Sequence, residues 1–494
     1  MVGVQKQMSR LKMALLPLLI SVGSIATAQD SGTPARPNED SIFQDKKDTQ
    51  GLDSSDPSRD AFASGEVTDN ALQIGGIYYQ RMILSGQQGS GTGNAPLSLP
   101  LQFDGFMDAR PNDRLRGFVD GRLLYDAARD QFSNSTSGNS AGSQQFTSTS
   151  TAPSGLAGAT PVHVPNNPQV ALDQAWLKFD IDRTVFVTAG KQHVKWGASR
   201  FWNPTDFLST QKRDPLLPYD LRLGNSMVKF ELPLEAKKTN FYGIVLFDNP
   251  QPASTLGQVG GALRAETLIG NAEIGLETVA RGGLNPVFGA DISAPLGPFD
   301  VYAEASCISG ASTSLQSTGT PTAGTDISTL FTSNAVQGPL YQISGGGNYM
   351  FGWRENRQAT VGLEYFYNQL GYGDSTAYPA LIFTGQFQPF YTGRNYAAIY
   401  LTAEGPDSEK HTSYTFSTLG NLSDQSFISR IDFSWRVLTY LTFESYIDAH
   451  YGTPGGEFNF TVSTPPLTFQ GTSIATIDFP PTFFDLGMAL RLSI

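Results

Sequence analysis

The sequence predicts an all-β protein, specifically a transmembrane antiparallel β-barrel. Three observations support this prediction. Long segments alternate apolar and polar residues with period two, the links between them alternate between short and long, and no segment has the ~18 consecutive apolar residues of a transmembrane helix. The 51 Gly, 30 Pro and 39% hydrophobic residues also suit many strands better than a helical core.

Residues 1–28 have the three parts of a secretory signal peptide. A basic region carries Lys6, Arg10 and Lys12, an apolar run follows, and small residues precede an expected cleavage after Ala28. Loss of three basic and no acidic residues takes the formal net charge from -12 to -15. This charge argues against nucleic acid as a partner, because phosphates would be repelled. Residues 29–70 mix charges and Ser without a period, which predicts a flexible periplasmic extension.

Residues 71–494 are expected to form the barrel. The clearest alternation lies in 114–127, 427–437, 441–450 and 484–494. These segments run to about 10 to 14 residues, as tilted membrane strands do, whereas strands of soluble sheets average ~5 to 6.

The links between segments predict the strand count. Short turns are expected near 111–112, 182–183, 234–238, 270–271, 295–298, 353–356, 405–409 and 438–439. Between them lie links at 86–98, 130–167, 197–222, 249–256, 282–285, 310–338, 370–394, 421–425 and 452–480, of which the fifth and eighth are short. About 18 strands result, with 16 as the alternative, and an even number places both barrel ends and the short turns on the periplasmic side. The longer loops are then extracellular.

Aromatic residues fall where the two membrane interfaces are expected. Trp353 and Trp435 lie near short turns, and Tyr365 and Tyr451 lie near long loops. Such aromatic girdles are typical of membrane barrels.

The stretch from Gly190 to Leu223 differs from the rest of the chain. Between Lys191 and Arg222 it holds six Lys or Arg against three Asp, within an acidic protein. We expect the loop near 197–222 to fold inward and narrow the lumen, where basic groups facing acidic wall residues would select solutes by charge. Its aromatic residues would either stack on solutes or pin the loop to the wall. The predicted constriction residues are Lys191, Lys195, Arg200, Trp202, Asp206, Lys212, Arg213 and Arg222.

Polar residues that alternate with the apolar face are expected to line a water-filled lumen. The predicted lumen-facing residues are Arg116, Asp120, Lys178, Arg264, Glu364, Arg430, Glu444 and Arg491. Four His, the single Cys307 and no H-E-x-x-H motif predict no enzyme, no cofactor and no dedicated metal site. His450, two residues from Asp448 on one strand face, predicts a solvated pair in the lumen, the alternative being part of a hydrolase site.

The stretch GKQHVKWGASRFWNPTDFL, from Gly190 to Leu208, resembles a G-x-x-x-x-x-W-G…N-P-x-D element of porin-like barrels. Together with the signal peptide and the alternating strands, residues 71–494 resemble the bacterial outer-membrane porin superfamily. The resemblance implies a location in the bacterial outer membrane, contact with its lipid, passage of small hydrophilic solutes and a homotrimer. The last residue is Ile494, where such barrels usually end in Phe or Trp.

Two functions follow as expectations. The first is a porin for passive diffusion of small hydrophilic solutes, anions or carbohydrates, through a constricted lumen. The second is a closed or occupied barrel that serves a partner, as an export or assembly component, a sheath or an adhesin. The Ser/Thr-rich segments 131–160 and 309–337 suit an exposed surface, which is compatible with this second function but does not require it.

Overall fold

The computed structural model describes residues 71–89, 95–128, 168–209, 211–217, 220–249, 251–252, 255–354, 357–383, 386–406, 411–469, 472–474 and 478–494. All of them belong to one compact unit, Asp40–Ile494. The predicted signal peptide, the predicted extension and segment 131–160 lie outside the described residues. Among the residues described, no helix combines the length and the apolar character needed to cross a membrane.

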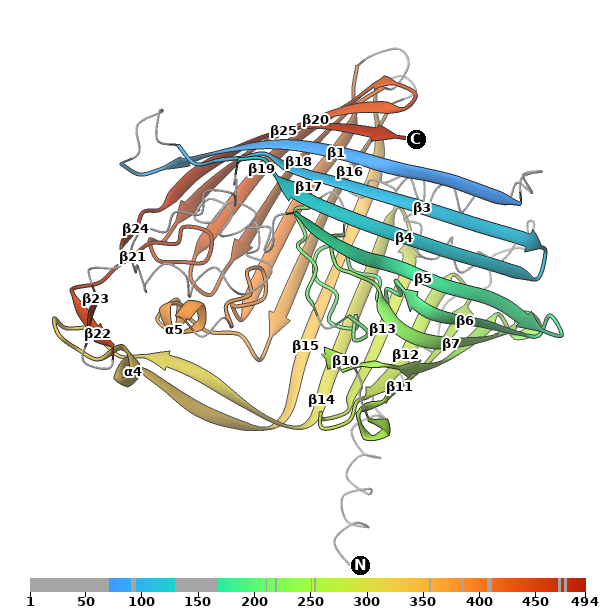
Figure 1. Ribbon diagram of the computed structural model, residues 1–494, viewed down its shortest axis with the longest axis horizontal. Coiled ribbons are helices and arrows are strands. Elements are labelled where there is room, and N and C mark those ends of the chain that lie inside the picture. Colours follow the sequence, from blue (N-terminus) through green and yellow to red (C-terminus); the bar gives the residue numbers. More distant parts are fainter. Residues whose placement is uncertain are drawn as a thin grey trace, which may run out of the picture. The chain divides into compact units, whose positions relative to one another are not determined.

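Eighteen long strands form a closed antiparallel barrel (Figure 1), which confirms the predicted fold class and strand count. They are β1 (Leu72–Gln87), β3 (Pro100–Asn112), β4 (Leu115–Asp126), β5 (Gln169–Ile181), β6 (Val185–Gln192), β7 (Asn225–Leu234), β8 (Thr239–Leu246), β11 (Gly260–Ile269), β12 (Ala272–Ala280), β13 (Val287–Leu296), β14 (Phe299–Thr318), β15 (Phe331–Arg354), β16 (Arg357–Asn368), β17 (Asn395–Glu404), β18 (Thr412–Asn421), β19 (Ser426–Leu438), β20 (Leu441–Gly452) and β25 (Thr482–Ser493). Each pairs with the next, and β1 also pairs with β25 from Ile77↔Ser493 to Gln87↔Thr482. This last pairing closes the ring.

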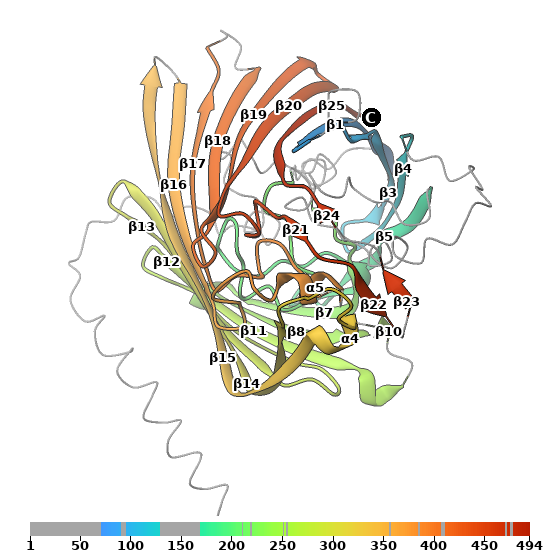
Figure 2. The ribbon, with the colours of Figure 1, turned by 90° about the vertical axis from the view of Figure 1, so that its left-hand side faces the viewer.

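Short strands and helices lie within the loops. They are β2 (Leu97–Ser98), η3 (Glu235–Lys237), β9 (Asp248–Asn249), β10 (Gln251–Pro252), η4 (Leu256–Gln258), α4 (Ile327–Leu330), α5 (Tyr378–Phe383), β21 (Val462–Ser463), β22 (Leu467–Phe469), β23 (Thr472–Ile474) and β24 (Asp478–Phe479). Inside the ring seen in Figure 2, Tyr378 and Leu381 of helix α5 cluster with Phe460, and Val462 of β21 and Phe479 of β24 pack against this cluster.

The two rims of the barrel differ as predicted. The short turns, such as those between β3 and β4 and between β19 and β20, lie at one rim, and the longer links lie at the other. The start of β1 and the end of β25 meet at the short-turn rim, where Gly76 and Ile494 exchange two backbone hydrogen bonds of 3.0 and 2.9 Å. Two boundaries differ from the prediction. Strand β6 ends at Gln192, not near Trp196, and β14 and β15 pair on from Ala311↔Gly338 to Thr318↔Phe331, which shortens the predicted 310–338 loop.

The two faces of each strand differ in character. On β16, Leu363 and Tyr365 are 62% and 44% exposed, whereas Glu364 and Phe366 are each 1% exposed. Because alternate side chains point to opposite faces, the apolar set faces outward and the polar set faces the interior. Outward aromatic residues lie at both rims: Trp353, Trp435 and Tyr440 near short turns, and Tyr365, Tyr451 and Phe484 near long loops. This outer surface is the one expected of a barrel embedded in lipid.

The β14–β15 hairpin extends farther than its neighbours and meets the loop between β20 and β25. Its two strands are 20 and 24 residues long. At its tip Gly324 donates to Pro466 O and Thr468 donates to Thr325 O, both at 2.9 Å. Figure 1 shows α4 of the hairpin tip beside β22. Two segments far apart in sequence are therefore joined at the long-loop rim.

Candidate functional site

The described part of the link between β6 and β7, residues 193–209, 211–217 and 220–224, lies inside the barrel and is anchored at both ends by one side chain, Asp173. This carboxylate pairs with His193 Nε2 at 2.8 Å and accepts a bond from the backbone amide of Gly224 at 3.0 Å. It also pairs with Arg122 at 2.8 Å. Asp173 is an extra residue in β5, because Asp120 pairs with Gln174 while Gly121 pairs with Leu172. Such a bulge redirects a side chain, and here it turns a carboxylate toward the root of the loop.

Glu304, on β14, binds the first turn of the loop. It accepts bonds from Ser199 N at 2.5 Å, Thr205 N at 3.3 Å and Thr205 Oγ1 at 2.7 Å. The neighbouring residues Ala303 and Ala305 are exposed on the outer face, whereas Glu304 is 1% exposed. Since β14 pairs with neither β6 nor β7, these bonds span the interior.

Glu364, on β16, binds the next residues of the loop. Its carboxylate accepts bonds from three successive backbone amides, those of Arg200 at 2.8 Å, Phe201 at 3.1 Å and Trp202 at 2.8 Å. Tyr302 on β14 also donates to it at 2.7 Å. A buried carboxylate is costly without such donors, and charge-assisted bonds are the stronger class. The loop backbone therefore provides the donors that this wall carboxylate needs.

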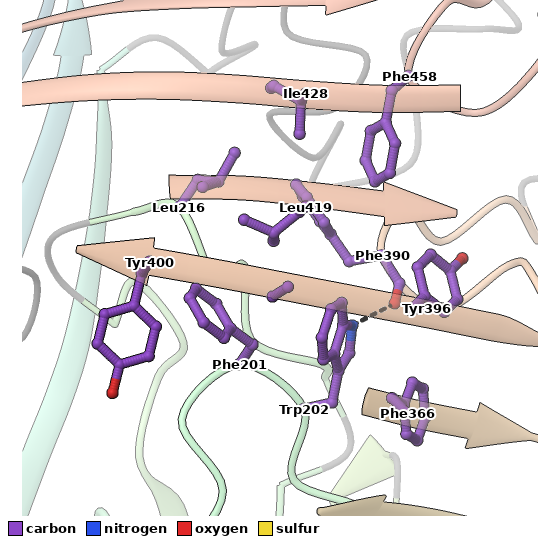
Figure 3. Close-up of a cluster of buried hydrophobic side chains, with 11 residues drawn as sticks. Phe201, Trp202, Leu216, Phe366, Phe390, Tyr396, Tyr400, Leu419, Ile428 and Phe458 are labelled. Atoms are coloured by element: carbon purple, nitrogen blue, oxygen red, sulfur yellow. Dashed lines mark hydrogen bonds between the residues drawn. The ribbon is translucent and has the colours of Figure 1, made fainter. Parts of the chain in front are cut away.

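Aromatic packing holds the same part of the loop (Figure 3). Trp202 is fully buried, stacks on Phe366 with ring centroids 5.8 Å apart, and donates its indole N–H to Phe390 O at 2.8 Å. Phe201 packs edge-on against Tyr400 at 5.8 Å. Of the two roles considered for these aromatic residues, pinning the loop to the wall fits their burial, and stacking on solutes does not.

The charged residues of the loop fall into two groups. Arg222 pairs with Asp206 at 2.7 Å and with Asp220 at 2.6 Å, so these charges satisfy one another. Although burial alone would raise the pKa of Asp220, Arg222 holds that pKa below its usual range. Arg213 also has interactions within the structure.

Three cations form the second group. Across the described part of the chain, Lys195, Arg200 and Lys212 have no carboxylate within ion-pair distance. The Arg200 guanidinium lies 4.1 Å from the centroid of the Tyr400 ring, and the Lys212 ammonium lies 5.6 Å from that of Tyr391. Burial lowers the pKa of Lys212, and Asp206 opposes this shift. Among the described residues of the loop, these three cations thus lack the carboxylate partners that neutralise Arg222.

Lys191 lies apart from the other predicted constriction residues. On β6 it is in register with Ala175, which is itself opposite the outward-facing, 43% exposed Val119. Its ammonium donates to Leu172 O at 2.7 Å. Register thus places Lys191 on the outer face, and we leave it out of the constriction.

The predicted lumen-facing residues are mostly joined in ion-pair clusters along the inner wall. Arg116 pairs with Asp108 at 2.9 Å, Arg264 with Asp291 at 2.6 Å, Arg430 with Asp432 at 2.8 Å, and Arg491 with Glu444 at 3.3 Å. Arg264 also pairs with Glu277 and lies 5.8 Å from the Trp196 ring of the loop. Asp120 is buried, and Lys178 is half-buried in register with Arg116. Because its charges are paired locally, the wall presents less free charge than its composition suggests.

For several residues that hold the loop, the sequence did not predict that role. Asp173 gives no signal, because a bulge is not visible in a period-two pattern. Glu304 stands out only as an acidic residue between alanines, and Phe390 acts through its backbone carbonyl.

Comparison with solved structures finds porins at low similarity. A porin of Rhodopseudomonas blastica, represented by engineered variants, has 10% identity and a TM-score of 0.38, covering 86% of this chain and 100% of its own. Outer membrane protein opdK of Pseudomonas aeruginosa has 9% identity and a TM-score of 0.45, and OccK9 (OpdG) of the same organism has 9% and 0.48, each match covering 86% of this chain and 98% of the other. No protein-family model matches the sequence, and no curated protein sequence matches it. The assignment of the fold therefore depends on the strand pairing described above.

Proposed function

We propose that this protein is an outer-membrane porin through which small hydrophilic solutes diffuse, narrowed by the loop between β6 and β7. The observation that carries the proposal is the binding of Ser199 through Trp202 to Glu304 and Glu364 across the barrel interior. A loop held in this way reduces the cross-section of a closed barrel whose outer face is apolar.

We infer that small anions pass more readily than cations. Lys195, Arg200 and Lys212 lack ion-pair partners among the described residues, whereas the acidic residues Asp206 and Asp220 are neutralised by Arg222. Carbohydrates receive less support, because Phe201 and Trp202 are buried and offer no free ring face.

Planar-bilayer recording tests the proposal. Purified protein should form discrete channels, and a salt gradient should give a reversal potential of the sign expected for anion preference. No conductance in any salt, with a folded barrel, would contradict the channel.

The second candidate, a closed or occupied barrel that serves a partner, is favoured by the buried packing inside the barrel. One interior cluster joins Phe201, Trp202 and Leu216 to β16 through β19 and to Phe390 and Phe458. A stoichiometric partner that copurifies with a non-conducting barrel would support this function over the porin.

Two further proposals concern location. Fractionation should place the protein in the outer membrane, and N-terminal sequencing of the mature protein should begin at Gln29 if the signal is cleaved after Ala28.

A further inference from the structure

A buried cluster of one His and two Asp lies away from the loop between β6 and β7, beside the seam of the barrel, where β25 pairs with β1. His450 and Asp448 project from β20 and Asp485 from β25, and each side chain is no more than 6% exposed. One ligand atom from each lies within 4.8 Å of the others. All three are near the long-loop rim, where β25 pairs with β1.

The hydrogen bonds of His450 show which of its two ring nitrogens carries a hydrogen. Nδ1 lies 2.9 Å from the backbone oxygen of Phe458, which can only accept, so Nδ1 carries a hydrogen. Nε2 lies 3.3 Å from Asp448 Oδ1 and 3.2 Å from Asp485 Oδ2. A neutral imidazole would thus direct a lone pair at two carboxylate oxygens. Something positive, a second proton or a metal ion, is required between them.

The spacing and the surroundings favour a metal ion. Ligands at the usual Zn–N and Zn–O distances of about 2.0–2.2 Å in a tetrahedron stand about 3.3–3.6 Å apart, close to the two separations of 3.3 and 3.2 Å from His450 Nε2. A metal-bound His normally donates its other N–H to a carbonyl or carboxylate, as His450 does to Phe458.

The carboxylates are themselves oriented by further bonds. Ser85 of β1 donates to Asp485 Oδ1, and the amide of Asp485 donates to Asp448 Oδ1 at 2.9 Å. Arg430 is nearer to Asp432, at 2.8 Å, than to Asp448, at 4.0 Å, so it only partly offsets the charge of the two aspartates.

We propose that Asp448, His450 and Asp485 bind one divalent transition-metal ion, with Zn²⁺ as the best match to one imidazole and two carboxylates. Ca²⁺ is a poor match, because it takes six to eight oxygen ligands. The ion joins β20 to β25 beside the β1 seam and, through His450, to the loop that carries Phe458. This role is structural and does not depend on conduction.

The test measures metal content in protein made without a histidine tag. Folded protein is incubated with Zn²⁺ or Ca²⁺ and separated from free metal. The bound metal per chain is then measured by elemental mass spectrometry. We expect about one retained Zn²⁺ per chain and no retained Ca²⁺. Asp448→Asn, Asp485→Asn and His450→Gln should each lower retained Zn²⁺ at least tenfold, and chelation should lower the temperature at which the wild-type barrel loses its compact migration on gels.

His193→Gln is the matched control, since His193 pairs with a single carboxylate, Asp173. It should retain Zn²⁺ as the wild type does. Folding of every variant is checked by heat-modifiable migration. A folded wild type that retains no Zn²⁺, or His450→Gln that retains as much as the wild type, would overturn the proposal and leave a protonated His450 paired with two aspartates.

Discussion

At the scale of single residues, burial and partners decide the role of each loop side chain. Trp202 and Arg200 are two positions apart, yet Trp202 is fully buried and Arg200 is half-buried over Tyr400 without a carboxylate partner in the described structure. The first residue holds the loop, and the second is one of the cations that we propose to meet solutes.

Neutralising the free cations should change ion selectivity. In Lys195→Gln/Arg200→Gln/Lys212→Gln we expect the anion-to-cation permeability ratio to fall roughly fivefold or more. One unit charge within about 4 Å of a passing ion contributes about 1 kcal/mol even in water. Reversal potentials in a salt gradient measure the ratio. Lys191→Gln, on the outer face, is the control and should leave it unchanged. Equal reversal potentials in the triple variant and the wild type would show that this loop does not line the constriction.

Removing the Trp202 side chain should free the loop. Trp202→Ala deletes a buried ring that stacks on Phe366 and bonds to Phe390 O, and large-to-small changes of this kind cost about 3–5 kcal/mol. We expect faster proteolysis within 193–224 and larger fluctuations of the single-channel current, with the barrel intact. Trp353→Ala, on the exposed outer face, serves for comparison. Identical proteolysis of both variants would show that Trp202 does not hold the loop.

At the scale of elements, the loop between β6 and β7 is held by wall carboxylates from strands that it does not adjoin. Glu364 alone accepts three loop amides, and an unsatisfied buried donor costs about 1–3 kcal/mol. The position of this loop is therefore a property of β14 and β16 as much as of its own residues.

Glu364→Gln should weaken this attachment and widen the channel. The side-chain amide offers donors where the loop also offers donors, so we expect higher single-channel conductance and faster hydrogen exchange at 200–202. Glu235→Gln, exposed at the turn between β7 and β8, is the matched control. Conductance equal to that of the control would argue that the loop does not limit the pore.

The loops at the long-loop rim are joined by another buried carboxylate, Glu457. It accepts bonds from Phe390 N, from Tyr396 Oη at 2.5 Å and from Asn421 Nδ2 at 2.7 Å. Burial, with the charge of Asp424 adding to it, raises the pKa of Glu457 to about 8. The ordered loops therefore bind this proton more tightly than unfolded loops do.

The resulting pH dependence has a definite sign. Stability from this group is fully present below about pH 4.5, the ordinary value for Glu, and is lost as the pH rises through about 8. Limited proteolysis within 386–394 and 453–460 should thus be faster at pH 9 than at pH 6. Glu457→Gln should reduce this difference. A wild type equally resistant at both values would contradict the raised pKa.

At the scale of the whole molecule, stability comes from ring closure, because β1 pairs with both β3 and β25 and the eighteen described barrel strands have no edge. All eighteen barrel strands lie within 72–493. A chain lacking residues 29–70 should therefore fold, show heat-modifiable migration and conduct as the full mature chain does. Loss of heat-modifiable migration would assign those residues a part in folding the barrel.

Alternation along the chain predicted the barrel strands and their two faces, because side-chain direction in a strand depends on residue parity, and the lengths of the links predicted the strand count and the two unlike rims. The same parity predicted that Glu364 and Arg430 face inward. The composition of the loop, by contrast, placed Lys191 in the constriction, whereas the register of β6 places it on the outer face. Asp173 gave no signal, because a bulge breaks the period there.

The sequence by itself determined the strands, their outward apolar face and the basic character of the loop between β6 and β7. Only the tertiary structure decided that the backbone of this loop binds Glu304 and Glu364, that its aromatic residues pack on β16 and β17, and that His450 meets Asp485. The reason is physical. Strand formation depends on neighbours in the chain, whereas the pairing of inward charges depends on which distant strands ring closure brings together.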